Sequence, residues 1–280
     1  MTIIADSGST KAEWVVLRDG AAEDTVMTGG INPYFLSAEE ITALLERELT
    51  GIQGLPADRV YFYGTGCNTP EKNDIVRAAL GKFFLTDEVY VGSDLLGAAR
   101  SLCHDEPGIA CILGTGSNSC YYDGNQVVSN VPALGYILGD EGSAAVLGRK
   151  LLSDILKRQL PPEVIDLFNE KYSLTQAEIL DNVYRKSFPS RFMGSFSRFL
   201  SENIEIPELR QIVVSSFDEF IVRNILQYSE ATRCPIHVTG SVAYHFSEVL
   251  SGCLAKYGLK PGKITVAPMV ELIKYHIRHL

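Results

Sequence analysis

Two stretches of this chain follow one plan: a short apolar run, a turn of Gly, Ser and Thr, and a second strand-like run that ends in Asp-Gly. The first occupies residues 3–20 and the second residues 111–124. Glycine removes the Cβ clash, so the backbone N–H groups of such a turn can approach a polyanion closely and act as fixed partial positive charges. A hairpin design used twice therefore predicts that two turns hold the phosphates of a nucleotide from both sides.

The sequence around these hairpins alternates between strand-like and helical patterns. In the first third, strands are expected at 60–63 and 89–91, and helices at 38–49, 70–81 and 95–104. This alternation is typical of an α/β domain with a mixed sheet. The Pro-Gly turn in residues 105–108 is the expected internal boundary.

The second half is mostly helical. We expect a loop at 135–142, a helix capped by Ser143 that runs to Leu160, and further helices as far as residue 232, one of them starting at Pro207. The final part is expected to contain a strand at 236–239, a turn at 240–241, a helix at 242–257, a strand at 264–266 and a terminal helix from 269.

Composition narrows the classes of function. Apolar residues make up 46% and charged residues 21% of the 280, which is ordinary for a globular protein, and the net charge of −9 without a Lys/Arg block argues against nucleic acid as a partner. No run approaches the ~20 apolar residues of a membrane span, and no leader pattern precedes Asp6. The six cysteines lack metal-ligand spacing, so buried thiols in a reducing compartment, the cytoplasm, are expected.

Four segments carry a resemblance when they are taken together and in order. They are residues 6–11, 114–118 (GTGSN), 139–144 (GDEGSA) and 239–242. This series resembles the motifs of the N-acetylglucosamine kinase and BadF/BadG/BcrA/BcrD ATPase family, which belongs to the actin, sugar-kinase and Hsp70 superfamily. The resemblance implies an α/β fold of two RNase H-like (actin-like ATPase) lobes around a central nucleotide cleft.

The same resemblance implies a domain organisation. The N-terminal lobe is expected at residues 1–107 and is joined by the terminal helix 268–280. The C-terminal lobe is expected at 108–267, with a helical insert at about 150–232. The insert also offers a face on which a homodimer could form.

The resemblance implies that the first turn binds Mg²⁺ and ATP. Asp6 matches the carboxylate that holds Mg²⁺, although an Asp in a turn often bonds only its own backbone. The residues expected to cradle the phosphates are Gly8, Ser9, Thr10 and Lys11. The family often has another Thr after the Lys, where this chain has Ala12, so one hydroxyl is missing.

Asp94 matches the family's general base, which takes the proton from the sugar hydroxyl. It follows a strand, at the edge where α/β sheets bind ligands. The alternative is that Asp94 is the N-cap of the helix expected at 95–104, a position that Asp favours. The two roles are compatible.

The remaining family positions divide into sugar and nucleotide contacts. The implied sugar contacts are Asn32, Thr65, Gly66, Thr115, Gly116 and Asp140. The implied nucleotide contacts are Gly114, Thr115 and Gly116 for the phosphates and Gly240 and Ser241 for adenosine. Asp140 could instead position the base, and a pair of carboxylates in a loop is often merely solvated. The final helix departs from the family, because it carries residues 270–272 (Val-Glu-Leu) where relatives have Gly-Ala.

The expected function is an ATP-dependent kinase that phosphorylates a hydroxyl, O6, of an amino sugar such as N-acetylglucosamine. One alternative is an ATPase that activates a CoA-ester reductase or dehydratase, for which Cys67 is the nearest candidate iron-sulfur ligand. Another is a non-catalytic sensor of sugar or nucleotide. The presence of both Asp6 and Asp94 argues against a non-catalytic site. One such cysteine per subunit falls short of the two that an activator usually needs, so the kinase is favoured.

Overall fold

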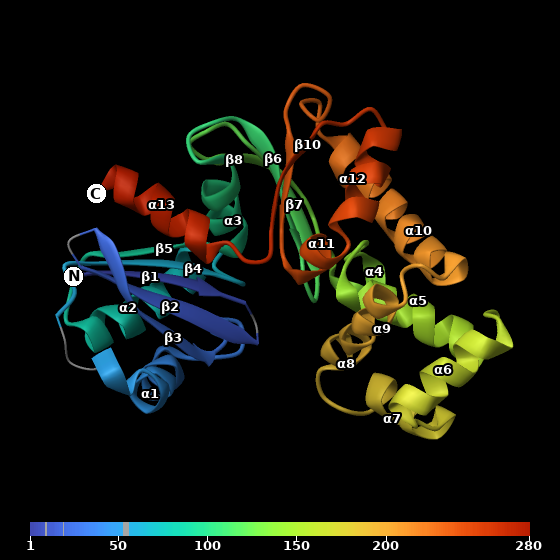
Figure 1. Ribbon diagram of the computed structural model, residues 1–280. Helices are drawn as coiled ribbons and strands as arrows, with labels where there is room; N and C mark the ends of the chain where they lie inside the picture. The colour runs from blue at the N-terminus through green and yellow to red at the C-terminus, as the bar shows by residue number, and fades with distance from the viewer. Residues whose placement is uncertain (9, 19, 53–55) are drawn as a thin grey trace. The chain divides into compact units, whose positions relative to one another are not determined.

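The chain forms two compact units, each built around its own five-stranded sheet (Figure 1). The computed structural model describes residues 1–8, 10–18, 20–52 and 56–280, so Ser9 lies outside the described residues. The first unit comprises Met1–Glu106, Gly124–Gln126 and Pro268–Leu280. The second unit comprises Pro107–Asp123 and Val127–Ala267.

The sheet of the first unit has the order β3-β2-β1-β4-β5. Its strands are β1 (Thr2–Ser7), β2 (Lys11–Arg18), β3 (Ala21–Gly29), β4 (Arg59–Gly64) and β5 (Val89–Ser93). The first three strands are antiparallel neighbours, and β4 and β5 run parallel to β1. The hairpin predicted near the start of the chain is confirmed. Strand β3 was not predicted, because it is an edge strand that is exposed over most of its length and shows no apolar alternation.

The sheet of the second unit repeats this plan with the order β10-β9-β6-β7-β8. Its strands are β6 (Gly108–Leu113), β7 (Ser117–Tyr122), β8 (Val127–Val131), β9 (Ile236–Thr239) and β10 (Pro261–Thr265). Counted along the chain, each sheet has its strands in the order third, second, first, fourth, fifth. The repeated hairpin is therefore part of a repeated five-stranded unit.

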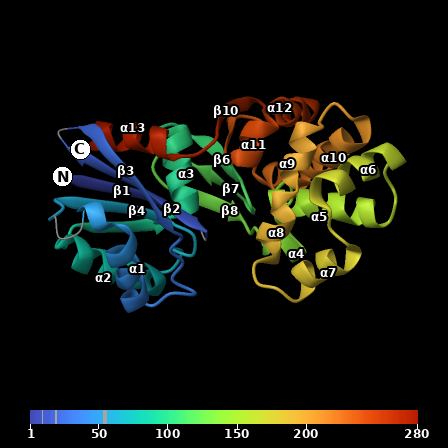
Figure 2. The same cartoon turned by 60° about the horizontal axis from the view of Figure 1, so that its bottom comes forward.

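Helices cover both faces of the first sheet (Figure 2). They are α1 (Ala38–Glu48), α2 (Pro70–Phe84), α3 (Asp94–Cys103) and α13 (Met269–His279), with a short 3-10 turn at Thr50–Ile52. Successive residues of β1 point to opposite faces, so Ile3 packs in the core beneath α1 and α2, whereas Ile4 packs with Met269 and Leu272 of α13. The helices after β3 and β4 therefore lie on one face and α13 lies on the other.

Helix α13 packs against the first unit, and some of its contacts come from residues 270–272, where this chain differs from the family. Leu272 is fully buried, and Glu271 pairs at 3.2 Å with His104, the residue that follows α3. His276 is also buried, 3.0 Å from the hydroxyl of Tyr63, and burial lowers the pKa of its imidazole to about 3. In this chain Glu271 and Leu272 thus help to fix α13 to the first unit, whereas Val270 is exposed.

The helices of the second unit match the predicted series with three corrections. They are α4 (Gly135–Leu138), α5 (Ala144–Leu156), α6 (Pro162–Tyr172), α7 (Gln176–Tyr184), α8 (Pro189–Ser195), α9 (Ser197–Glu202), α10 (Pro207–Arg223), a 3-10 turn at Ile225–Gln227, α11 (Ser241–His245) and α12 (Ser247–Lys256). Ser143 caps α5 as predicted, but the helix ends at Leu156 rather than Leu160, and α4 occupies the expected loop. The helix expected at 242–257 breaks at Phe246, whose buried ring packs against Phe217.

The expectations from composition can also be compared with the fold. Five of the six cysteines are buried and Cys234 is partly buried, as expected of small apolar side chains. In the part of the chain that the structure describes, no helix is both long and apolar enough to cross a membrane.

Candidate functional site

Three parallel strands of the first unit end at one edge of the sheet and carry polar residues there. The register pairs Ser7 of β1 with Gly64 of β4, and Gly64 with Ser93 of β5. The backbone N–H of Thr65 then donates to the carbonyl of Ser7 at 2.9 Å. Because the carboxyl ends of parallel strands form the ligand-binding edge of α/β sheets, this register gathers Asp6, Thr65 and Asp94 at such an edge.

The carboxylate of Asp94 is held by two hydrogen bonds. Thr65 Oγ1 donates to Oδ2 at 2.7 Å, and the backbone N–H of Leu95 donates to Oδ1 at 2.8 Å. Burial raises the pKa of Asp94, and these two hydrogen bonds oppose that rise. Each oxygen keeps further acceptor capacity, so the group can still take a proton from a ligand.

The interpretation of Asp94 as the helix N-cap is wrong. The N-cap of α3 is Ser93, whose hydroxyl accepts from the N–H of Leu96 at 3.1 Å. Asp94 is the first residue inside the helix. The sequence did not separate the two, because Ser and Asp are both favoured caps and the helix boundary differs by one residue.

Asp6 lies in an environment with an excess of negative charge. Burial is the main cause that raises the pKa of its carboxyl to about 7, and the neighbouring Asp94 and Glu13 raise it further, whereas Lys11 lowers it. A divalent cation would offset both the desolvation and the repulsion. No group of three or more His, Cys, Asp or Glu side chains is placed to hold a metal among the described residues, but Mg²⁺ commonly uses one or two carboxylates together with substrate phosphates and water.

This pKa predicts how stability depends on pH. The carboxyl of Asp6 titrates near 3.8 when unfolded and near 7 when folded. Between these values the folded state binds more protons than the unfolded state, so the free energy of unfolding should fall as pH rises. The contribution of Asp6 to this slope corresponds to a difference of at most about one bound proton, and it should level off above the folded pKa. Denaturant unfolding from about pH 4 to about pH 8 should show this slope in the wild type and a smaller slope in Asp6→Asn. Equal slopes would contradict the assignment.

Asn32 and Gly66 bring two loops of the first unit into contact. The side chain of Asn32, after β3, accepts from the N–H of Tyr34 at 3.0 Å. A Cβ placed on Gly66 would lie 2.5 Å from Asn32 Oδ1, and Gly66 has a positive φ of 83°. The structure therefore places Asn32 beside Gly66, the residue that follows Thr65.

The glycines at the start of the two repeated turns are not required by the fold. The N–H of Gly8 donates to the carbonyl of Lys11, and that of Gly114 to the carbonyl of Gly116, both at 3.0 Å. A Cβ on Gly8 would meet only Lys11 O, at 3.7 Å, and one on Gly114 would meet nothing within 4 Å. Gly8 and Gly114 thus have open space at their Cβ positions. Thr10 and Lys11 are exposed.

Asp140 is the carboxylate that the second unit places against its glycine turn. Its Oδ1 accepts from the N–H of Ser117 at 3.1 Å, and a Cβ on Gly116 would lie 3.0 Å from its Oδ2. It is buried, which raises its pKa, and it adopts a positive φ of 53°. The interpretation of Asp140 and Glu141 as a solvated pair is wrong, since Glu141 pairs with Arg223 at 2.5 Å.

Gly240 lies against the same turn. A Cβ on this residue would be 2.2 Å from the carbonyl oxygen of Leu113 and 3.2 Å from the nitrogen of Gly114. Its φ of 125° is a conformation that other residues rarely adopt. The second unit therefore brings Gly114 to Gly116, Asp140 and Gly240 together, with Ser241 exposed at the start of α11.

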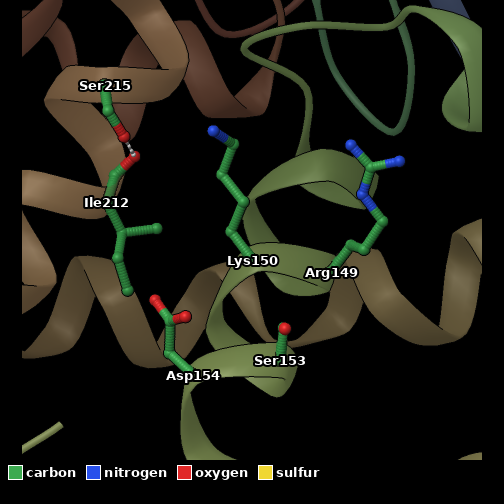
Figure 3. Close-up of a pocket in the computed structure, with 6 residues that line it drawn as sticks. All are labelled: Arg149, Lys150, Ser153, Asp154, Ile212 and Ser215. Carbon is green, nitrogen blue, oxygen red and sulfur yellow. Dashed lines mark hydrogen bonds between the residues drawn. The ribbon is translucent and has the colours of Figure 1, made fainter. Parts of the chain in front are cut away.

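A cavity of about 410 Å³ lies elsewhere in the second unit, on α5 and α10 (Figure 3). Its lining residues are Arg149, Lys150, Ser153, Asp154, Ile212 and Ser215. Lys150 is paired with Glu219 at 2.7 Å. None of the predicted site residues lines this cavity, so the polar strand ends remain the better candidate for the functional site.

Sequence reasoning did not identify three residues near the site, Tyr34, Asn68 and Lys72. Tyr34, in the loop that follows β3, contacts each of the other two. The adjacent aromatic residues at 34–35, close to Asn32 in the chain, were a signal that could have found Tyr34. No comparable signal marked Asn68 or Lys72.

Solved structures of other proteins share this fold. No family model and no curated protein matches the chain. A candidate N-acetylglucosamine kinase from Chromobacterium violaceum is 15% identical with a TM-score of 0.72, and the alignment covers 98% of each chain. A ROK family glucokinase from Streptomyces griseus, in complex with glucose and AMPPNP, is 14% identical with a TM-score of 0.57 over 98% of this chain and 97% of its own. The protein thus has the actin-like ATPase fold that sugar kinases share.

A solved structure with much higher sequence identity shows the family to which the chain belongs. A candidate N-acetylglucosamine kinase from Porphyromonas gingivalis is 44% identical, with a TM-score of 0.94 and complete coverage of both chains. This chain therefore belongs to the N-acetylglucosamine kinase family.

Proposed function

We propose that the protein is an ATP-dependent kinase that phosphorylates N-acetylglucosamine or a similar amino sugar, with O6 as the acceptor. The observation that carries this proposal is the carboxylate of Asp94, which is buried at the ligand-binding edge of the first sheet. Hydrogen bonds from Thr65 and Leu95 orient it there. The 44% identity to the P. gingivalis protein supports the same class of reaction.

In the proposed reaction the sugar hydroxyl oxygen attacks the γ-phosphorus of ATP. Its proton passes to Asp94, the bond from phosphorus to the bridging oxygen breaks, and ADP leaves. Asn32, Gly66, Thr115, Gly116 and Asp140 are proposed to contact the sugar. A raised pKa suits Asp94 to this role, because a base with a pKa nearer neutrality accepts a proton more readily.

The two glycine turns are proposed to bind the nucleotide. Gly8, Thr10, Lys11 and Gly114 would face the phosphates, and the open space over Gly8 and Gly114 supports this assignment. Gly240 and Ser241 would contact adenosine. Mg²⁺, held through Asp6, would neutralise phosphate charge, and the carboxylates around Asp6 supply the negative charge that such an ion needs.

The alternative of an electron-transferring activator ATPase is disfavoured by Cys67. This thiol is only 2% exposed, and burial raises its pKa to about 12. A cluster ligand must be a thiolate that faces the metal, so Cys67 is unsuited to hold iron.

Thr65 is proposed to position the base in addition to lining the sugar site. Thr65→Val should lower kcat by roughly tenfold, because a hydrogen bond to a charged group is lost. It should also move the acidic limb of the kcat profile to higher pH, since this bond lowers the pKa of Asp94.

Thr65→Ser keeps the hydroxyl and is the matched control for the valine variant. It should retain most of the activity and the wild-type pH profile. A valine variant whose acidic limb does not move would show that Thr65 does not act through Asp94.

The first test of the function is ADP release with Mg-ATP in the presence and absence of a panel of sugars. The panel comprises N-acetylglucosamine, N-acetylmannosamine, glucosamine, glucose and N-acetylmuramic acid. Release that depends on one sugar supports the kinase, and NMR of the product identifies the phosphorylated oxygen. Hydrolysis without sugar dependence, or binding without turnover, would overturn the kinase in favour of the activator or the sensor.

Two further proposals concern the cellular location and the oligomeric state of the enzyme. We propose a cytoplasmic location, where ATP and free sugars are both present, and a homodimer. Fractionation and light scattering test them, and a single-chain mass at micromolar concentration would contradict the dimer.

A further inference from the structure

The loop after β3 presents two exposed aromatic side chains next to Asn32. Tyr34 is 53% exposed and Phe35 is 80% exposed. Large apolar side chains in solvent are informative when they lie beside a polar site, because burial is their usual state.

The ring of Tyr34 is exposed but also fixed. Its hydroxyl donates to Asn68 Oδ1 at 3.2 Å, and its backbone N–H donates to Asn32 Oδ1 at 3.0 Å. Lys72 Nζ, on α2, lies 4.5 Å from the ring centroid and donates to the carbonyl of Pro33 at 3.0 Å. One lysine thus holds both the ring and the backbone that carries it.

The fixed ring lies at the proposed sugar contacts. A Cβ on Gly66 would be 3.1 Å from Tyr34 Cδ2 and 2.5 Å from Asn32 Oδ1, so ring and amide flank the same glycine. Gly66 follows Thr65, which bonds Asp94. Phe35 has no such anchoring side-chain contact among those seen in the described residues, although its backbone N–H donates to the carbonyl of Asn32 at 3.0 Å.

We infer that Tyr34 is a sugar-binding residue whose ring packs against the apolar C–H face of a pyranose, and that Lys72 is its positioning residue. A pyranose has polar edges and an apolar face, so a site that binds it needs an amide such as Asn32 beside a flat apolar surface. Lys72 covers part of the ring and leaves the remainder for a ligand. Because the ring is already held, little conformational entropy is lost on binding. The inference rests on the proposed kinase function.

The test compares four variants for their sugar KM, ATP KM and kcat. Tyr34→Ala should raise the sugar KM roughly five- to tenfold and leave the ATP KM and kcat within about twofold, because an aromatic packing contact is removed from sugar binding alone. Tyr34→Phe keeps the ring but loses the hydrogen bond to Asn68, so its sugar KM should lie between that of the wild type and that of Tyr34→Ala. Lys72→Met should give an intermediate sugar KM, and Phe35→Ala, the matched control, should change nothing.

Each outcome separates this inference from the function on which it rests. A wild type that turns over a sugar, with an unchanged sugar KM in Tyr34→Ala, overturns the inference and leaves the kinase intact. An equal effect of Phe35→Ala, or an equal rise in the ATP KM, also overturns it, because the loop would then act through general structure. A wild type that turns over no sugar overturns the kinase and the inference with it. Thermal unfolding of each variant checks that the fold is retained.

Discussion

Asp94→Asn should lower kcat by about 10²- to 10⁴-fold while the KM values for sugar and ATP change little. The amide keeps the shape of the side chain: its oxygen can accept from the N–H of Leu95, and its nitrogen can donate to the hydroxyl of Thr65. It cannot, however, take a proton. The variant should be at least as stable as the wild type, because burial raises the pKa of Asp94 and so penalises its charged form. Steady-state kinetics and denaturant unfolding on the same preparation measure both effects.

Ser93→Ala provides the control for this prediction. It removes the hydroxyl that caps α3 through the N–H of Leu96 and should cost about 1 kcal/mol of stability. Its kcat should remain close to that of the wild type. If Ser93→Ala lost activity as Asp94→Asn does, the loss would come from the helix end rather than from a base.

Gly240→Ala should destabilise the second unit by at least about 3 kcal/mol. The added methyl group would lie 2.2 Å from the carbonyl oxygen of Leu113, on a residue whose φ is 125°. The neighbour is backbone of β6, so it cannot move aside as a flexible side chain would. Denaturant unfolding gives the change in stability, and nucleotide binding by calorimetry should weaken as the turn at Gly114 is displaced.

Gly252→Ala is the matched glycine substitution. This residue lies inside α12, and a Cβ there would meet nothing within 4 Å. The variant should be more stable by about 0.5–1 kcal/mol, since alanine favours the helix. A Gly240→Ala protein as stable as Gly252→Ala would show that the contact of Gly240 with β6 is not needed.

Much of the local structure could be predicted from the sequence because its causes are local. Ser143 caps the helix that it was predicted to cap, and Pro207 begins a helix as predicted. Both hairpins that were predicted from the repeated design are present, as β1 with β2 and as β6 with β7. The edge strands β3 and β8 could not be predicted, since they are largely exposed and lack the alternation that a half-buried strand shows.

The groupings within the site required the tertiary structure. Thr65 and Asp94 are 29 residues apart, and only the parallel register of β4 and β5 brings their side chains to 2.7 Å. Asp140 was predicted to contact the sugar, with a solvated pair as the alternative. Its burial depends on the fold of the second unit around Gly116.

The sequence by itself therefore determined the repeated hairpins, the helix starts and the residue types at the strand ends, because neighbouring residues control turns, caps and periodicity. The tertiary structure decided which strand ends meet, which carboxylates are desolvated and which ring stands fixed beside Asn32. These three features depend on contacts between residues far apart in the chain. Strand pairing sets the geometry of the site, and burial away from water sets the pKa of its carboxylates.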